Sequence, residues 1–336
     1  MTASDRSLSP AAAARSLGVS VKALRLWEAH GLVAPGRTGA GWRAYGPSDL
    51  ERAREVAALR GLGLSLGAVK RALGGDSSAL GEALAAHETL LEARLGETSG
   101  LLARIRTLRT GLARGGRLEP GALAALTRTS AAPAVELVLP WPWDGEVLTL
   151  PPLPPLAWIT GPLGSGKTRL AEALAKALPG GAFLPLDRAP PRAADAAASQ
   201  RVEAALRWIE EEGGRKSDAL AALLIAIEGA GTGPLVVDLV EEGLDASAQE
   251  ALAAWLRRRP PGARPLVLMT RSSAMLDLAA AGPGEAVLYC PANHGSPMLV
   301  VPVPGAAGYE AVESCLATPA ARERTRGLTA VRSGQR

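Results

Sequence analysis

The eight residues GPLGSGKT, at positions 161–168, decide the fold of the larger part of this chain. They match the P-loop pattern G-x-x-x-x-G-K-[ST] in full, in which glycines let backbone N–H groups wrap a phosphate at the start of a helix. Lys167 would then reach the β- and γ-phosphates of a nucleotide, and the Thr168 hydroxyl would bind Mg²⁺. The predicted nucleotide-binding residues of this loop are Gly161, Gly164, Ser165, Gly166, Lys167 and Thr168.

The sequence on either side of the loop favours this interpretation over a chance match in a Gly-rich turn. An apolar strand at residues 156–160 leads into the loop, and an Ala- and Leu-rich helix follows it. Further on, PLVVD at residues 234–238 is typical of a buried parallel strand whose terminal acid, Asp238, holds Mg²⁺. These features predict an α/β P-loop NTPase domain with a mainly parallel sheet over residues 136–318, with ATP and Mg²⁺ as its cofactors.

The residues that follow this strand carry a resemblance to a known family. The run DLVEEGLD, from Asp238 to Asp245, resembles the Walker B and D-loop segments of ABC-type ATPases, and the likeness spans roughly residues 135–305. One departure from that pattern concerns catalysis, because Leu239 stands where the water-activating Glu is usual. The resemblance therefore implies ATP binding more firmly than ATP hydrolysis.

Two other parts of the pattern are changed. Arg271 or Ser272 falls where such ATPases often carry a switch His, and EGGRKS at residues 212–217 is the nearest approach to an LSGGQ signature. Glu241 or Glu242 could replace the missing base, although their spacing from the Walker acid is unusual. The domain is identified as a degenerate P-loop ATPase of ABC or AAA type, in which slow or absent hydrolysis and competent hydrolysis are both left open.

The N-terminal part of the chain has a different pattern. Four short stretches begin at Ser and end at or near Gly, as capped helices do; they are residues 9–18, 20–32, 48–63 and 65–75. The first two are joined by LGVS at residues 17–20, which is the layout of a helix-turn-helix with the second helix as the reading helix. The Gly- and Arg-rich loop at residues 33–45 is typical of a wing.

Positive charge is concentrated in the same region. Residues 1–75 hold nine Arg and two Lys against five acidic residues, a surplus of six positive charges, whereas the whole chain carries only +4. Clustered Arg and Lys neutralise phosphates, so a basic segment ahead of a mildly acidic body indicates a nucleic-acid-binding head. An ordinary solvated surface is the alternative.

Residues 1–75 are predicted to form an all-α winged helix-turn-helix head, and about residues 8–73 of it resemble the DNA-binding domain of MerR-type transcription regulators. The likeness rests on LGVSV at residues 17–21, on the second helix and on GWRAY at residues 41–45, where the family usually has Gly-Tyr-Arg-x-Tyr. It implies contacts of the second helix and the wing with the major groove or its phosphates. The predicted DNA-binding residues are Lys22, Arg25, Trp27, Arg37, Trp42, Arg43 and Tyr45.

Residues 76–114 predict a long helix with an apolar stripe. The stripe fills most of a heptad spacing, the pattern of a coiled-coil seam, and its members are Leu84, Leu91, Leu95, Leu102, Ile105 and Leu112. Thr98 and Arg109 interrupt it, so a helix packed on its own protein is the alternative. In the MerR family this helix pairs antiparallel with its twin, which implies a homodimer.

The remaining segments are predicted to be a linker at residues 115–135 and a frayed polar tail at residues 319–336. His294, in a loop rich in Pro and Gly, is expected to be solvated. No apolar run approaches the roughly 18 residues that cross a bilayer, and two cysteines exclude a disulfide framework. We therefore expect a cytoplasmic protein without a membrane partner.

The two halves together predict a dimeric transcription regulator that binds double-stranded promoter DNA and carries an ATP-binding sensor domain. RNA polymerase is the further partner that the MerR resemblance implies. The alternative is an ATP-hydrolysing DNA-maintenance ATPase of ABC type, in which the head is only a tether. A third possibility is that the P-loop domain has lost its function and that only the head acts.

Overall fold

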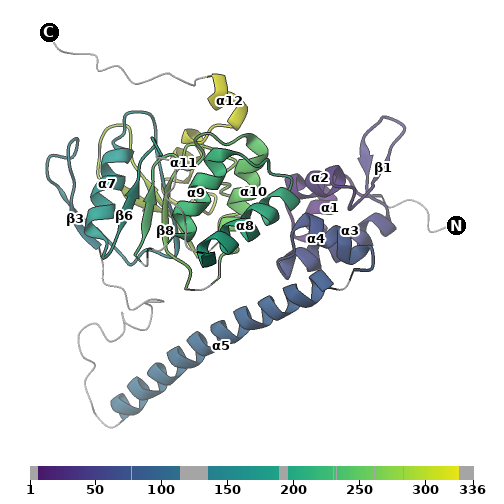
Figure 1. The fold of residues 1–336 in the computed structure, drawn as a ribbon, viewed down its shortest axis with the longest axis horizontal. Helices are drawn as coiled ribbons and strands as arrows, with labels where there is room; N and C mark the ends of the chain where they lie inside the picture. The colour runs from purple at the N-terminus through teal and green to yellow at the C-terminus, as the bar shows by residue number, and fades with distance from the viewer. Residues whose placement is uncertain are drawn as a thin grey trace. The chain divides into compact units, whose positions relative to one another are not determined.

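The computed structural model describes residues 7–76, 78–113, 135–188, 196–229, 231, 233–260, 262–282 and 284–324. The chain divides into two compact units, Met1–Leu95 and Gly96–Arg336, and one long helix crosses the division (Figure 1). The predicted linker lies outside the described residues except for Val135, which already belongs to a strand. The described part of the predicted tail is not frayed, because Pro319–Arg324 form a short helix, α12.

Four short helices, as predicted, and a small hairpin in the wing form the head, which lies within the first unit. They are α1 (Pro10–Leu17), α2 (Val21–Ala29), α3 (Pro47–Gly61), α4 (Leu66–Leu73) and the antiparallel pair β1 (Gly36–Arg37) and β2 (Arg43–Ala44). The hydroxyls of Ser9, Ser20 and Ser65 each accept a hydrogen bond from the backbone N–H three residues on. Gly18 takes φ +65° in the turn between α1 and α2, a conformation that favours glycine.

The start of α3 differs from the prediction of a serine cap at Ser48. The helix begins at Pro47 with Gly46 as its N-cap, and the Asp49 carboxylate accepts a hydrogen bond from the Gly46 N–H at 2.8 Å. Proline is favoured at the first helical position because it has no N–H that would need a partner there. This preference moves the start of the helix ahead of the serine.

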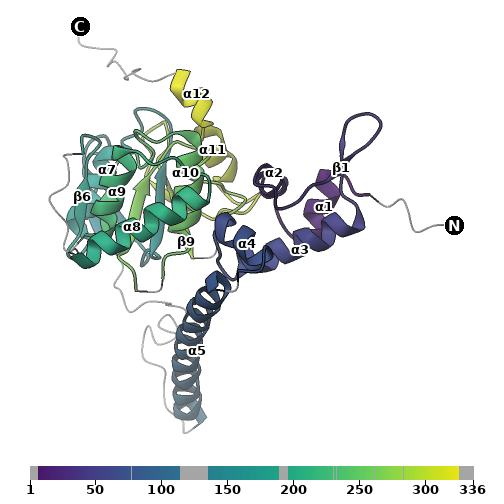
Figure 2. The same cartoon turned by 45° about the vertical axis from the view of Figure 1, so that its right-hand side comes forward.

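A single helix of 36 residues, α5 (Ser78–Ala113), follows the four short ones and is uninterrupted in both views of the chain (Figures 1 and 2). The six side chains of the predicted stripe are exposed, from 41% at Ile105 to 67% at Leu95. They are therefore open to a partner helix. Although α5 is long, neither it nor any other described helix has an apolar stretch that could cross a membrane.

A six-stranded sheet is the centre of the second unit, in the order β10-β9-β5-β8-β7-β6. Its strands are β5 (Leu156–Thr160), β6 (Ala182–Leu184), β7 (Leu235–Val237), β8 (Leu266–Met269), β9 (Glu285–Tyr289) and β10 (Met298–Val300). Neighbouring strands run parallel, except that β10 is antiparallel to β9. The predicted mainly parallel sheet is confirmed, and the carboxyl ends of β5 and β7 lie at the same edge, with β8 between them.

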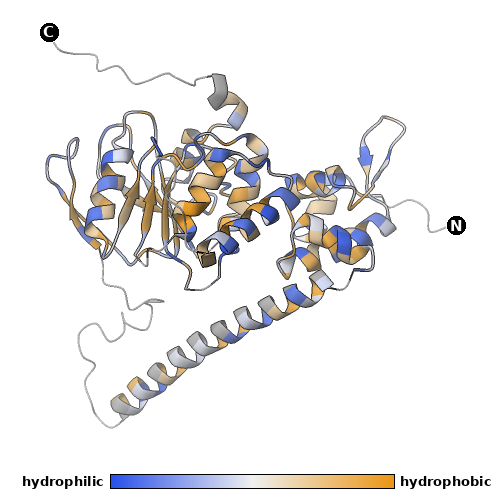
Figure 3. Ribbon diagram, viewed as in Figure 1, coloured by the Kyte–Doolittle hydropathy of each residue, from blue (hydrophilic) through white to orange (hydrophobic). Residues whose placement is uncertain are grey.

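Secondary structure covers both faces of this sheet. One face packs against α8 (Ala196–Glu211), α9 (Asp218–Glu228), α10 (Ala246–Leu256) and α11 (Tyr309–Cys315), and the other against α7 (Lys167–Ala177) and the hairpin of β3 (Val135–Val138) and β4 (Val147–Leu150). Along β5, Leu156 and Trp158 enter the first core, and Ala157 and Ile159 enter the second. The central strands are accordingly apolar on both sides, as their orange colour in Figure 3 shows.

Candidate nucleotide site and nucleic-acid interface

The glycine loop connects the carboxyl end of β5 to the first turn of α7. Gly161, Gly164 and Gly166 have φ of +151°, +81° and +88°, which L side chains rarely adopt. A Cβ atom on Gly161 would collide with the backbone oxygen of Cys290, and one on Gly166 with the indole of Trp143. Glycine is therefore required here both for backbone conformation and for space, and the loop stands at a helix N-terminus, where an anion is favoured.

Lys167 is the first residue of α7, and its ammonium group is bonded to the loop. Nζ donates to the backbone oxygen of Pro162 and, at 3.4 Å, to Oγ of Ser165, and Lys167 is only 7% exposed. Burial lowers the pKa of Lys167 to about 8. An anion beside this ammonium would offset its desolvation, which is the role that the sequence predicts for it.

Thr168 and Asp238 meet across the carboxyl ends of β5 and β7. Thr168 Oγ1 donates to the Asp238 carboxylate, 3.3 Å from Oδ2 and 3.5 Å from Oδ1. Asp238 is 6% exposed, and burial raises its pKa. Adjacent hydroxyl and carboxylate oxygens suit Mg²⁺, and together with the glycine loop and Lys167 they fit a magnesium nucleotide. When bound, Mg²⁺ would neutralise charge on the β- and γ-phosphates.

The turn after Asp238 contacts an arginine that the sequence does not single out. Leu239 has φ +38°, in the left-handed region that is uncommon for a residue other than glycine. Arg188 Nη2 donates to the backbone oxygens of Asp238 and Leu239, at 3.3 and 2.8 Å. Burial lowers the pKa of Arg188, and the charges of Glu242 and Asp238 oppose that shift. A lone arginine in the loop after β6 has no local pattern that would predict this placement.

The carboxylate of Glu241, one of the two candidate bases, contacts the next loop. Glu241 is 3% exposed, and its Oε1 accepts a hydrogen bond from the backbone N–H of Arg271 at 3.0 Å. The adjacent Ser272 hydroxyl donates to Oε1 of Gln249 on α10 at 2.6 Å. Glu241 therefore joins the turn after β7 to the turn after β8, and its use as a base would require that contact to break. Glu242, the other candidate, is partly exposed.

A loop from the carboxyl end of β9 also reaches the glycine loop. His294 is exposed, as expected, yet its Nε2 lies 3.1 Å from the backbone oxygen of Gly164. Its ring centroid is 6.4 Å from that of Trp141, and Trp143 Nε1 donates to the backbone oxygen of Gly295 at 3.0 Å. The β3–β4 hairpin and this loop are thus joined next to the glycine loop, which the sequence alone does not indicate.

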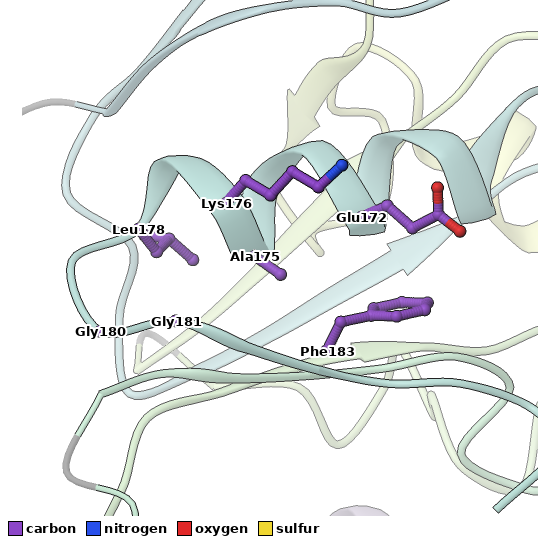
Figure 4. A pocket seen from close by; sticks show the side chains of 7 residues that line it. All are labelled: Glu172, Ala175, Lys176, Leu178, Gly180, Gly181 and Phe183. Atoms are coloured by element: carbon purple, nitrogen blue, oxygen red, sulfur yellow. The ribbon is translucent and has the colours of Figure 1, made fainter.

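A separate hollow of about 560 Å³ lies beside the second half of α7. Seven residues from α7, from β6 and from the segment between them line it (Figure 4): Glu172, Ala175, Lys176, Leu178, Gly180, Gly181 and Phe183. In Figure 4 the Phe183 ring lies opposite α7, on the side of the hollow formed by β6. None of the predicted nucleotide-binding residues belongs to this lining, so the hollow is distinct from the glycine loop.

Four of the predicted DNA-contacting residues are exposed in the first unit. Lys22 and Arg25 are exposed on α2, and Arg37 and Trp42 are exposed in the wing, Trp42 by 75%. Arg37 Nη1 donates to the backbone oxygen of Gly41 at 3.1 Å and so bonds across the wing. The second helix and the wing thus present cations and an aromatic ring to solvent.

Trp27 and Tyr45 lie in the hydrophobic core of the head instead, with 4% and 0% exposure. This burial does not fit the expectation that the two side chains face DNA. The family resemblance indicates where a residue lies in the chain, whereas the burial of its side chain depends on how the head packs. Arg43 is half-buried, and its Nε pairs with Oε2 of Glu28 at 2.5 Å. That ion pair joins β2 of the wing to α2.

Comparison with known families identifies this head. The model of the MerR HTH family regulatory protein matches residues 8–75. Residues 8–75 are a MerR-family helix-turn-helix domain. The match covers all four short helices and the wing of the MerR-family domain, and it ends before α5.

Two curated relatives resemble part of the chain. The nodulation protein NolA of Bradyrhizobium sp. (strain NC92) is 35% identical over 98 residues, which are 29% of this chain and 41% of that protein. NolA of Bradyrhizobium elkanii is 33% identical over 99 residues, which are 29% of this chain and 45% of that protein. The chain thus spans less than half the length of the curated relatives it matches.

Solved structures resemble parts of the chain at low similarity. HiNmlR, a MerR family regulator lacking the sensor domain and bound to promoter DNA, is 24% identical, with 38% of this chain and 98% of that chain covered and a TM-score of 0.28. A putative metal-chelate type ABC transporter in an inward-facing conformation is 14% identical, with 49% of this chain and 81% of that chain covered and a TM-score of 0.34. At TM-scores this low, neither likeness assigns a function to this chain.

Proposed function

We propose that the protein is a DNA-binding transcription regulator whose second unit binds ATP with Mg²⁺. The proposal is carried by the presence of two features in one chain. One is a MerR-family domain, and the other is a glycine loop whose Lys167 and Thr168 lie with Asp238 at one edge of a parallel sheet. The first feature suits DNA and the second suits phosphates, so the chain combines a DNA-binding head with a nucleotide site.

The DNA is double-stranded and is bound by α2 and the wing. A helix-turn-helix places its second helix in the major groove, where the exposed Lys22 and Arg25 of α2 would contact bases or phosphates. Arg37 and Trp42 of the wing would contact the DNA beside this helix. A promoter and RNA polymerase are the partners that follow from the MerR resemblance.

The nucleotide acts as a ligand more than as a fuel. Leu239 follows Asp238 directly, at the position where a water-activating carboxylate would stand, and a leucine cannot accept a proton. Glu241 is already bonded to the backbone of Arg271. The site therefore has residues for Lys167-dependent phosphate binding and for Mg²⁺, whereas Glu241 would have to leave its bond before it could act as a base.

The regulator acts as a homodimer that pairs through α5. Its six stripe side chains are exposed by 41% to 67%, and pairing would remove this apolar area from water. Two-fold pairing would also present two copies of α2 to two half-sites of a duplex. Pairing through α5 therefore also predicts an operator with two half-sites.

Calorimetric titration of the full chain with ATP and Mg²⁺ tests the nucleotide half of the proposal. Wild type is expected to bind, and Lys167→Ala is expected to bind far more weakly, because the loop loses its ammonium. Lys176→Ala, on the exposed side of the same helix, is the matched control and is expected to bind like wild type. Equal ATP affinity in wild type and Lys167→Ala would overturn the assignment of the loop.

Two further measurements test the function as a whole. Selection of bound duplexes from a random pool is expected to yield one recurring site with two related halves, which a tether without sequence preference would not yield. The turnover of ATP is expected to stay near background. Fast turnover in wild type that falls sharply in Glu241→Gln would favour the DNA-maintenance ATPase instead.

A further inference from the structure

Arg188 has most of its hydrogen-bonding capacity unused. It lies in the loop after β6, and its Nη2 donates to the backbone oxygens of Asp238 and Leu239 at 3.3 and 2.8 Å. Its Nε and Nη1 are buried and have no hydrogen-bond partner within the described part of the chain. Two of the three guanidinium nitrogens are thus shielded from water, and no described residue supplies an acceptor in its place.

This arrangement is costly unless a ligand completes it. An unbonded polar group costs more to bury when it is charged, and native proteins leave few such groups. A guanidinium offers several N–H donors in a planar fork, which matches the oxygens of a phosphate. The unused donors of Arg188 are therefore suited to a phosphate group.

The surroundings of Arg188 indicate which phosphate this is. Its partner Asp238 accepts a hydrogen bond at 3.3 Å from Thr168 Oγ1, in the first turn of α7. Lys167, the residue before it, bonds to the glycine loop. Arg188 therefore reaches the same cluster as the glycine loop, but from the loop after β6 and through its bonds to the turn after β7.

We infer that Arg188 is a phosphate-binding residue that contacts the terminal phosphate of a nucleoside triphosphate in the glycine loop, through Nε and Nη1. The inference rests on the proposed function. A diphosphate lacks the group that Arg188 binds, so Arg188 makes the site selective for the triphosphate.

Arg188 also links binding of the triphosphate to the conformation of two neighbouring loops. Arg188 holds the backbone oxygen of Leu239, whose φ of +38° makes this turn a strained one. The turn continues to Glu241, which bonds to the loop after β8. A terminal phosphate on Arg188 would therefore act on two loops at once, with no need for hydrolysis.

The test compares the affinities for ATP and ADP, each with Mg²⁺, by calorimetry on the full chain. Wild type is expected to prefer ATP. Arg188→Gln is expected to lower ATP affinity about ten- to a hundredfold and ADP affinity by less than about threefold, because the charge-assisted bonds are made only to ATP. Arg188→Lys keeps the charge without the fork and is expected to keep part of the preference.

Arg201→Gln is the matched control, because Arg201 is an exposed arginine of the same unit that pairs with Glu228. It is expected to leave both affinities unchanged. Equal losses of ATP and ADP affinity in Arg188→Gln would assign Arg188 to holding the turn at Leu239. Unchanged affinities for both nucleotides would remove Arg188 from the site. Either result overturns the inference. Thermal unfolding of Arg188→Gln and Arg188→Lys separates lost binding from lost folding.

Lys167→Ala in the same series distinguishes a failure of this inference from a failure of the proposed function. If wild type binds neither nucleotide, or binds both as well as Lys167→Ala does, the loop is not a nucleotide site and the proposed function fails with the inference. If ATP binding depends on Lys167 and its preference over ADP does not depend on Arg188, only the inference fails.

Discussion

Two arginines of the head differ in what surrounds them, and their contributions to DNA binding should differ accordingly. Arg25 is exposed on α2, whereas Arg43 is bonded to Glu28. An arginine that neutralises a DNA phosphate releases counterions, and its loss flattens the slope of log K against log salt by about one unit. We expect that change in Arg25→Ala. Arg43→Ala should weaken binding with a smaller change in slope, because Glu28 already balances its charge.

Titration of one duplex at several salt concentrations measures the affinity and the slope together. A slope that is flatter by a full unit in Arg43→Ala would show that the Arg43 guanidinium contacts a phosphate and not Glu28 in the complex. An unchanged affinity would mean that the ion pair between β2 and α2 has no part in orienting the wing.

Leu239 makes the proposed lack of hydrolysis testable. Leu239→Glu places a carboxylate next to Asp238, where it could accept a proton from a water molecule about 3 Å away. We expect ATP turnover to rise above the wild-type background. Leu239→Gln introduces a side chain of nearly the same shape as glutamate that cannot act as a base, so the turnover of this variant should remain at background. A rise in both variants would trace the effect to the shape of the turn, and a rise in neither would mean that more than a base is missing.

Lys167 should make ATP binding depend on pH. Burial lowers its pKa from 10.5 to about 8, so the ammonium of the free protein loses its proton as the pH rises through about 8. A bound phosphate favours the charged form and raises that pKa again. ATP affinity should therefore be constant below about pH 8 and fall by up to about tenfold per pH unit above it, with uptake of a proton on binding. Calorimetry in buffers of different ionisation enthalpy measures both quantities, and a flat affinity above pH 8 would contradict the assignment.

Among the elements, the strands around the glycine loop were the most predictable, because each is a short apolar run bounded by turn residues. β5 has the predicted bounds, and β7 begins one residue inside the predicted run. The start of α3 was less predictable, because Pro47 and the Asp49 carboxylate together outweigh a serine cap.

The candidate site was predictable where its residues follow a local pattern. The loop motif indicated Lys167 and Thr168, and the apolar strand before Asp238 indicated that residue; the structure brings all three together. Arg188 was not predictable, because its place depends on β6 lying beside β7 in the sheet. The burial of Trp27 depends in the same way on how the head packs.

The helix α5 should decide the oligomeric state. Leu95→Glu combined with Leu102→Glu places two charges in the exposed stripe, and burying them against a second copy would be costly. We expect sedimentation of the full chain to show a dimer for wild type and a monomer for this double variant. Thr107→Glu, an exposed position outside the stripe, should leave the dimer intact. A double variant that remains dimeric would assign pairing to another surface.

For the whole molecule, the two proposed ligands should influence each other. A coupling of about 1–3 kcal/mol changes an affinity by about five- to a hundredfold, and the effect must be the same in both directions. ATP should therefore change the affinity for the selected duplex, and that duplex should change ATP affinity by the same factor, without turnover. Lys167→Ala should bind the duplex with an affinity that ATP does not alter. Independent affinities in wild type would mean that each unit binds its own ligand and that the second unit is no sensor of the kind proposed.

The packing of Trp143 against Gly166 has an optical consequence. The indole is 5% exposed, lies against the loop and donates to the backbone oxygen of Gly295. Indole emission responds to the electric field at the ring, and a nucleotide in the loop would add several negative charges beside it. Seven tryptophans contribute to the total emission, so the change that disappears in Trp143→Phe isolates this ring. Filling and emptying of the loop can then be followed in real time through the protein's own fluorescence, without a label.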